Sequence, residues 1–204
     1  MPFKTFADTN ILNASDVNTY LMKQSVIVCT SSTRPSSPNE GMSIYETDTD
    51  RFLIYSGTSW TMFLSVGWIG WDPPTLSYGS TGTDWNLGNS TFTSGYFRTG
   101  NTVIARMRIA WGTTAVFGTK QLGFNLPAPS AYTFAQMVGS GLATDTSPTA
   151  TAYPLTANGG GGRFDLQATL TNGTYAQNTG VTSTIPFTWA STDTVDFILV
   201  YEAA

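Results

Sequence analysis

One alternating stretch, Val103–Trp111, constrains the fold of this chain more than any other feature of its sequence. Apolar side chains occupy every second position there: Val103, Ala105, Met107, Ile109 and Trp111. Arg106 and Arg108 fall between them. Since successive side chains of a strand point to opposite faces of a sheet, this period of two predicts a half-buried strand. Gly95–Thr99 is the expected partner strand, because Gly100–Asn101 supplies the positive φ angles of a tight hairpin turn.

The segment Val195–Tyr201 repeats this pattern, with Asp196 and Glu202 on the opposite face. We therefore expect a mainly β fold, in which an antiparallel, jelly-roll-like β-sandwich head is closed by this last strand. The strands expected in the head are 76–79, 90–98, 102–111, 121–126, 132–139, 151–156, 163–170, 181–189 and 195–201. The expected loops are 112–119, 139–149, 158–162 and 171–180.

The composition suits turn-rich β structure. Charged residues make up only 11% of the chain and aromatic residues 13%, whereas about 25% charged residues is usual. The net charge of −4, without a basic patch, disfavours nucleic-acid binding, which depends on phosphate contacts. No apolar run approaches the roughly 20 residues of a membrane span, so no membrane insertion is expected.

The N-terminal part combines a short helix with a small meander. Asn13 or Ser15 is the expected N-cap of a helix over residues 14–24. Three short strands are expected next, at 41–46, 51–55 and 60–63, after a proline-containing linker at 31–38. These elements bury too little apolar area to be stable alone, which favours a homotrimer. The expected domains are an N-terminal oligomerisation module at 1–64, a linker at 65–74, and the head at 75–204.

Several stretches of the chain resemble segments of known proteins. The N-terminal ones are Ser15–Met22, Arg34–Pro38, Gly41–Met42, Tyr45–Thr49 and Tyr55–Trp60; the C-terminal ones are Pro186–Ala190 and Tyr201–Ala204. They are similar to segments of bacteriophage tail-fibre proteins and of minor tail proteins from phages of actinobacteria. The resemblance implies a homotrimeric virion protein, exposed on the particle, with an N-terminal attachment part and a β-sandwich head.

The residue types argue against catalysis. The chain has no histidine, which removes most catalytic triads, most zinc sites and the usual general base near neutral pH. Glu46, Asp48 and Asp50 are the only clustered acids, and alternation of Asp with Thr is typical of hairpin turns. We therefore expect no enzyme activity, no catalytic residues, no metal site and no cofactor.

The aromatic residues divide into core and candidate contacts. Six within expected strands are assigned to the core: Phe97, Trp111, Phe124, Phe187, Trp189 and Phe197. Four in or near loops are candidate glycan contacts: Trp85, Phe117, Tyr153 and Tyr175. Five residues are candidate contacts to the virion or to other copies: Val17, Tyr20, Leu21, Trp68 and Trp71. Trp68 and Trp71 lie at the expected boundary and would cover the base of the head.

The functional hypothesis is a non-enzymatic phage structural protein of the minor tail or tail-fibre type. Residues 1–64 would bind other virion proteins, and the head would adhere to host cell-surface polysaccharide through several weak sites. A capsid decoration or head-fibre protein is the first alternative. A polysaccharide depolymerase and a cellular carbohydrate-binding module are the others.

Overall fold

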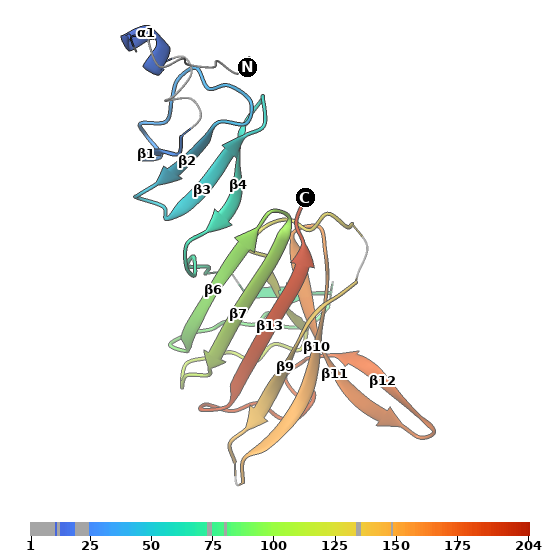
Figure 1. The fold of residues 1–204 in the computed structure, drawn as a ribbon. Coiled ribbons are helices and arrows are strands. Elements are labelled where there is room, and N and C mark those ends of the chain that lie inside the picture. The colour runs from blue at the N-terminus through green and yellow to red at the C-terminus, as the bar shows by residue number, and fades with distance from the viewer. Residues whose placement is uncertain are drawn as a thin grey trace. The chain divides into compact units, whose positions relative to one another are not determined.

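The computed structural model describes residues 11, 13–18, 25–72, 75–79, 81–133, 136–147 and 149–204, and Figure 1 shows that strands predominate. These residues confirm the mainly β fold with a short N-terminal helix. They belong to two compact units. Unit 1 runs to Gly67 and includes Arg98–Gly100, and unit 2 comprises Trp68–Phe97 and Asn101–Ala204.

Helix α1 of unit 1 spans Ala14–Asp16. The side chain of Asn13 accepts a hydrogen bond from the backbone N–H of Asp16 at 2.9 Å, which satisfies a donor of the first turn. Asn13 is therefore the N-cap, one of the two candidates that the sequence offered. The remainder of the expected helix, at residues 19–24, lies outside the described residues.

The predicted meander is confirmed in unit 1. Its strands are β1 (Ile27–Cys29), β2 (Ser43–Glu46), β3 (Arg51–Tyr55) and β4 (Trp60–Ser65). β2, β3 and β4 pair in antiparallel order, and β1 pairs parallel with β2. Among the described residues of unit 1, the buried apolar ones are Met42, Ile44 and Leu53. The expected linker is held in place, since Ser31 donates from its N–H and hydroxyl to Asp48.

Unit 2 contains the remaining strands. They are β5 (Thr75–Tyr78), β6 (Thr91–Thr99), β7 (Thr102–Ala110), β8 (Gln121–Asn125), β9 (Gln136–Asp145), β10 (Thr151–Gly160), β11 (Arg163–Asn172), β12 (Tyr175–Gly180) and β13 (Thr194–Glu202). They pair in the order β6-β7-β13-β9-β10-β11-β8-β5, and β12 pairs with β11. The end of β6, from Arg98, belongs to unit 1. β13 lies antiparallel to both β7 and β9, so the last strand occupies an interior position in the sheet.

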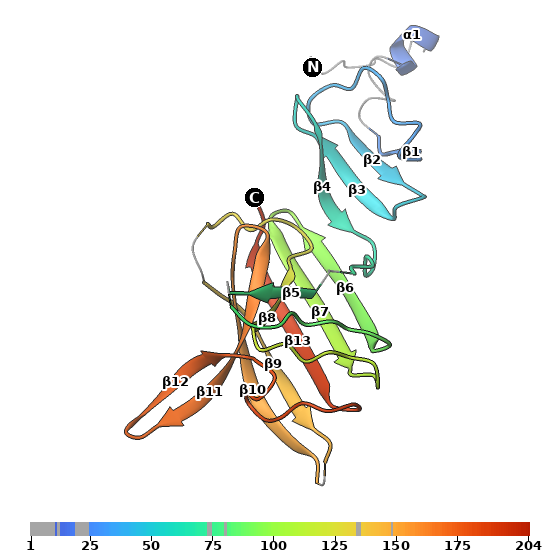
Figure 2. The ribbon, with the colours of Figure 1, turned by 180° about the vertical axis from the view of Figure 1, so that it is seen from behind.

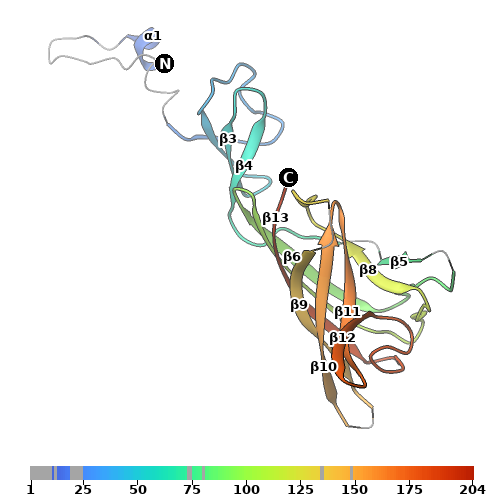
Figure 3. The ribbon, with the colours of Figure 1, turned by 90° about the vertical axis from the view of Figure 1, so that its right-hand side faces the viewer.

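The sheet of unit 2 curls so that one face encloses a single core. In Figures 2 and 3, β6, β7, β13 and β9 lie on one side and β5 and β8 on the other. Phe92 of β6 packs across this interior against Phe124 of β8, with ring centroids 6.5 Å apart. Because the strands follow one hydrogen-bonded path, the predicted sandwich of two sheets is not confirmed.

Three of the loops predicted in unit 2, at 139–149, 158–162 and 171–180, are partly strand. β9 extends to Asp145 through Gly139 and Gly141, where a Cβ atom would meet the β13 backbone carbonyls of Ile198 and Asp196. Glycine therefore permits close strand approach here rather than a loop. Residues 158–160 belong to β10, and β12 occupies most of the expected loop 171–180.

The expected strand 181–189 is irregular. Trp189 donates its backbone N–H back to Ser183, and Thr182 and Ile185 exchange hydrogen bonds. Pro186 has no N–H to contribute to a strand ladder. The segment nevertheless buries Phe187 and Trp189. Its alternating apolar residues therefore indicate burial, although the segment forms no regular strand.

Candidate functional site

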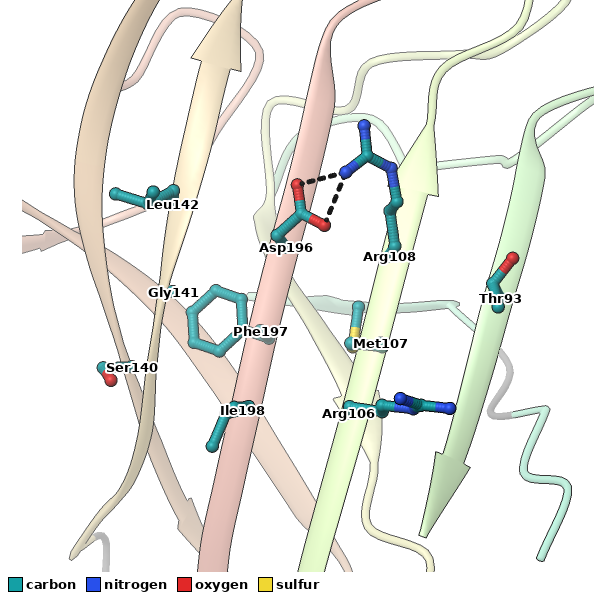
Figure 4. Close-up of a pocket in the computed structure, with 10 residues that line it drawn as sticks. All are labelled: Thr93, Arg106, Met107, Arg108, Ser140, Gly141, Leu142, Asp196, Phe197 and Ile198. Carbon is teal, nitrogen blue, oxygen red and sulfur yellow. Dashed lines mark hydrogen bonds and ion pairs between the residues drawn. The ribbon is translucent and has the colours of Figure 1, made fainter. Parts of the chain in front are cut away.

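The sheet of unit 2 presents a mixed charged and apolar surface away from the core. We call this surface the outer face; it is formed by Ile104, Arg106 and Arg108 of β7, Asp196, Ile198, Val200 and Glu202 of β13, and Ser140 and Leu142 of β9. Strand register aligns these residues in rows: Arg108, Asp196 and Leu142 form one, and Arg106, Ile198 and Ser140 the next (Figure 4).

Large apolar side chains are exposed on the outer face. Ile104, Leu142, Ile198 and Val200 are all exposed, with Val200 at 52%. A recess of about 670 Å³ lies over the rows around Arg106, Asp196 and Leu142. A contiguous apolar surface of this kind is typical of a binding site. Single exposed apolar residues scattered over a surface do not indicate one.

The charges of the outer face are only partly paired. Arg108 donates from Nη1 to both carboxylate oxygens of Asp196, at 3.1 and 3.3 Å. The guanidinium of Arg106 lies 4.3 Å from the ring centroid of Trp68, a cation–π contact. Glu202 accepts a hydrogen bond from the hydroxyl of Tyr132 at 3.0 Å, which raises the pKa of that phenol. This arrangement suits binding of a partner surface.

Of the residues predicted to contact the virion or other copies, Trp68 lies beside the outer face and is exposed. Trp71 instead packs against the core, with its ring 6.1 Å from Phe164. Val17 is half-buried and forms the C-cap of α1. Tyr20 and Leu21 lie outside the described residues. The structure thus does not bring the described members of this set onto one surface.

The predicted glycan contacts separate in the same way. Trp85 is only 5% exposed, and its Nε1–H donates to the carbonyl of Lys120 at 2.7 Å. Its ring lies 5.4 Å from Trp111 and 5.9 Å from Phe117. Trp85 is therefore a core residue, and its prediction as a sugar contact needs correction, because loop aromatics also pack beneath loops.

The other candidates differ in exposure. Phe117 is half-buried against the core beside Trp85 and Trp111. Tyr153 is half-buried and stacks on Phe187 at 5.1 Å. Tyr175 is 79% exposed at the start of β12, where the β11–β12 hairpin extends away from the other strands of unit 2 (Figure 1). Tyr175 is thus the member of the set whose ring is available to a ligand.

Strands β10, β11 and β12 carry a second surface that the sequence reasoning missed. Asn158 donates to Gln167 at 2.8 Å, and Thr169 donates to Asn178 at 2.9 Å. Asn178 also donates to Thr156 at 3.4 Å. We call these five residues the polar ladder. Mutually bonded amides and hydroxyls are held in fixed orientation and keep further donors and acceptors for a hydroxyl-rich ligand.

A small niche of about 80 Å³ lies next to Asn158, lined also by Thr133, Gly159, Gly160, Arg163 and Asp165. The buried Oδ1 atom of Asp165 accepts no hydrogen bond from the described residues. Burial raises the pKa of this carboxyl group, and the charge of Arg163 opposes that shift. The niche adds a carboxylate acceptor beside the polar ladder.

The three acids that cluster in the sequence accept hydrogen bonds from different donor residues. Glu46 is buried and accepts from Arg34 Nε and from Thr49 Oγ1. Asp48 accepts from Ser31, and Asp50 accepts from the hydroxyl of Tyr45 at 2.8 Å. Across the described ranges, no three potential metal ligands gather in one place. These hydrogen bonds stabilise the segment around the β2–β3 turn, in line with the alternation of Asp and Thr that is typical of turns.

Comparison of the chain with protein-family models, with curated proteins and with solved structures gives no match. Within the part of the chain that the structure describes, no helix is long and apolar enough to cross a membrane.

Proposed function

We propose that this chain is a non-enzymatic structural protein of a bacteriophage particle, of the minor tail or tail-fibre type. In this proposal unit 1 attaches the protein to other virion proteins, and unit 2 is displayed on the surface of the particle as a homotrimer. The resemblance of the sequence to such proteins suggests this class. The exposed apolar side chains of unit 1 are the observation that carries it.

Unit 1 exposes more large apolar side chains than its described residues bury. Val26, Val28, Phe63 and Val66 are exposed, with Val28 at 67%. Each such side chain gains about 1.5–3 kcal/mol when it is fully buried. A small sheet with this surface is better stabilised by packing against other chains than by itself. Attachment to a particle would provide that burial.

The attachment proposal is tested by Val28→Lys combined with Phe63→Lys. Both side chains are exposed, so the chain should still fold, whereas charged groups would oppose burial against a partner. We expect incorporation into particles, measured by immunoblot of purified virions, to fall by at least about tenfold. Thr58→Lys, at an exposed polar position of the β3–β4 turn, is the matched control and should leave incorporation unchanged.

Normal incorporation of the double variant would contradict attachment through this surface. Electron microscopy of gold-labelled protein on wild-type particles then distinguishes the two virion locations. Label on the tail supports the proposal. Label over the capsid favours a decoration or head-fibre protein instead.

Adhesion to host polysaccharide is proposed for the polar ladder and Tyr175. An exposed ring stacks on a sugar face while neighbouring amides and hydroxyls bind the sugar hydroxyls. Tyr175 follows the β11–β12 turn and shares a face of β12 with the exposed amide of Gln177, two residues further on, whereas Asn178 and the ladder lie on the opposite face of the hairpin. Surface chemistry of this kind provides weak binding that multiple copies strengthen.

We expect Tyr175→Ala to weaken binding of the full chain to purified host cell-wall polysaccharide by about fivefold to tenfold, since the stacking ring is lost. Tyr175→Phe keeps the ring and should bind nearly as the wild type does. Val116→Ala changes an exposed loop residue elsewhere and serves as the control. Equal binding by all three variants would exclude Tyr175 as a sugar contact.

A further inference from the structure

We propose that the outer face is the surface through which copies of this chain associate, with Arg106 of one copy facing Glu202 of the next. The homotrimer expected from the sequence would then be held together by unit 2 as well as by unit 1. This inference does not depend on the particle assignment, because self-association can be measured on the purified protein.

The position of the exposed apolar residues supports the proposal. Ile198 and Val200 occupy alternate positions of β13, on the face opposite the buried Phe197 and Leu199. Val200 pairs with Ile104 of β7, so these side chains form one patch across two strands. A strand that is apolar on both faces is typical of one covered on both sides.

Charge complementarity identifies a second copy as the occupant. The outer face carries two arginines and two carboxylates, so its formal charge is balanced. Arg108 and Asp196 neutralise each other within one chain. Arg106 and Glu202 have opposite signs, and neither forms an ion pair with any described residue. Arg106 lies over the ring of Trp68 and Glu202 accepts from Tyr132, so both keep their charge and could each meet the opposite charge of a second copy.

Arg106 and Glu202 are too far apart along the face to pair within one chain. Arg106 pairs in register with Ile198, whereas Glu202 pairs with Thr102, four residues before Arg106 in β7. Four strand residues span roughly 13 Å, too far for an ion pair within the chain. In a closed ring of copies, each Arg106 would meet the Glu202 of its neighbour.

The apolar part of the face is tested by Val200→Asp in the full chain. Analytical ultracentrifugation of the wild type at micromolar concentration should give a trimer. We expect the variant to weaken association by at least about a hundredfold and to sediment as a monomer, because a charge would be buried at the contact. Near-UV circular dichroism establishes that the variant is folded, and Val200→Ser provides a milder change should it not be.

Val116→Asp is the matched control, since Val116 is 50% exposed but lies in a loop outside the outer face. It should remain a trimer. A trimer that withstands Val200→Asp but is lost in the Val28→Lys/Phe63→Lys variant would place association in unit 1 and overturn this inference. A monomeric wild-type protein would overturn it as well. Unchanged association with lost polysaccharide binding would show that the recess serves a ligand instead.

The charge pairing is tested by reversal. Arg106→Glu and Glu202→Arg should each weaken association by about tenfold or more, because each places like charges together. The double variant Arg106→Glu/Glu202→Arg restores opposite charges and should recover most of the wild-type association. Failure of the double variant to recover, with both single variants impaired and folded, would refute the Arg106–Glu202 contact.

Discussion

Trp189→Ala is expected to lower the free energy of unfolding of unit 2 by about 3–5 kcal/mol, the range for removal of a large buried aromatic side chain. Trp189 is buried, with its ring 4.4 Å from Phe187 and 6.0 Å from Trp111. Its Nε1–H donates to the carbonyls of Thr182 and Ile185 at 3.0 and 3.2 Å. The variant therefore leaves a cavity and removes one of the two hydrogen bonds that each carbonyl accepts, since Thr182 and Ile185 still bond each other through their backbones.

Urea unfolding of the full chain, followed by near-UV circular dichroism, measures this loss. Trp189→Phe separates the two contributions, since it retains much of the ring volume but no donor. It should cost about 1–3 kcal/mol. Tyr175→Ala, at an exposed position, should change the free energy of unfolding by under about 0.5 kcal/mol. A loss below about 1 kcal/mol for Trp189→Ala would contradict the packing described here.

Arg34→Ala is expected to destabilise unit 1 by about 3 kcal/mol, because it leaves the buried carboxylate of Glu46 without its cation. Arg34 donates from Nε to Glu46, and Thr49 donates to the other carboxylate oxygen at 2.7 Å. Glu46 has no exposed surface. The contact also connects the proline-containing segment to β2, so its loss should free that segment.

Hydrogen exchange of the amides in β2 and β3 reports this local loss of stability directly. Asp84→Ala is the control, because the Lys120–Asp84 pair, at 2.8 Å, is exposed on its acidic side. An exposed pair contributes at most about 1 kcal/mol. If Arg34→Ala and Asp84→Ala had equally small effects, Glu46 could not be a buried carboxylate that depends on Arg34.

The same variant should change how unit 1 responds to pH. Burial by itself raises the pKa of Glu46, but hydrogen bonds from Arg34 and Thr49 and the charge of Arg34 bring it below its ordinary value. A carboxyl with a lowered folded-state pKa stabilises the wild type above its unfolded pKa of about 4.3. That contribution is lost as the pH falls through the folded pKa.

In Arg34→Ala the effect of burial is no longer offset by the arginine. The pKa of Glu46 should then rise above its ordinary value, so that protonation favours the folded state. Unit 1 of the variant should consequently be closer to the wild type in stability at pH 4 than at pH 7. Hydrogen exchange at the two pH values, corrected for intrinsic rates, measures this difference.

Local periodicity predicted the parts of the fold in which one face of a strand is buried. β7 and β13 were identified because each alternates strictly over its length. β12 was missed because most of its side chains are exposed, so no face of the strand carries an apolar pattern. β9 was cut short because Gly139 and Gly141 look like loop residues until the strand that passes them is known.

Prediction of which aromatic side chains are buried is limited in the same way. Five of the six predicted core aromatics are buried, and Phe97 is half-buried. Trp85 was assigned to an exposed loop, yet the chain folds back so that Trp111 and Trp189 cover it. A sequence shows that a residue lies between strands, but it does not show which side of the loop the interior occupies.

The sequence predicted only part of the outer face. The polar alternation of Arg106 and Arg108 is a local pattern, and so is the presence of Ile198 and Val200 on the less apolar side of β13. Their alignment in rows depends on pairing between segments that are remote in the chain. Cross-strand register of this kind is set by tertiary structure, beyond the reach of periodicity.

The central place of β13 has a consequence for synthesis. A ribosome releases residues 102–110 and 136–145 well before residues 194–202, so the two strands that β13 joins emerge with unsatisfied hydrogen-bonding edges. Nascent chains halted before residue 194 should be prone to aggregation and dependent on chaperones. Refolding of the intact polypeptide should also be slow, since its decisive pairing is so distant in sequence.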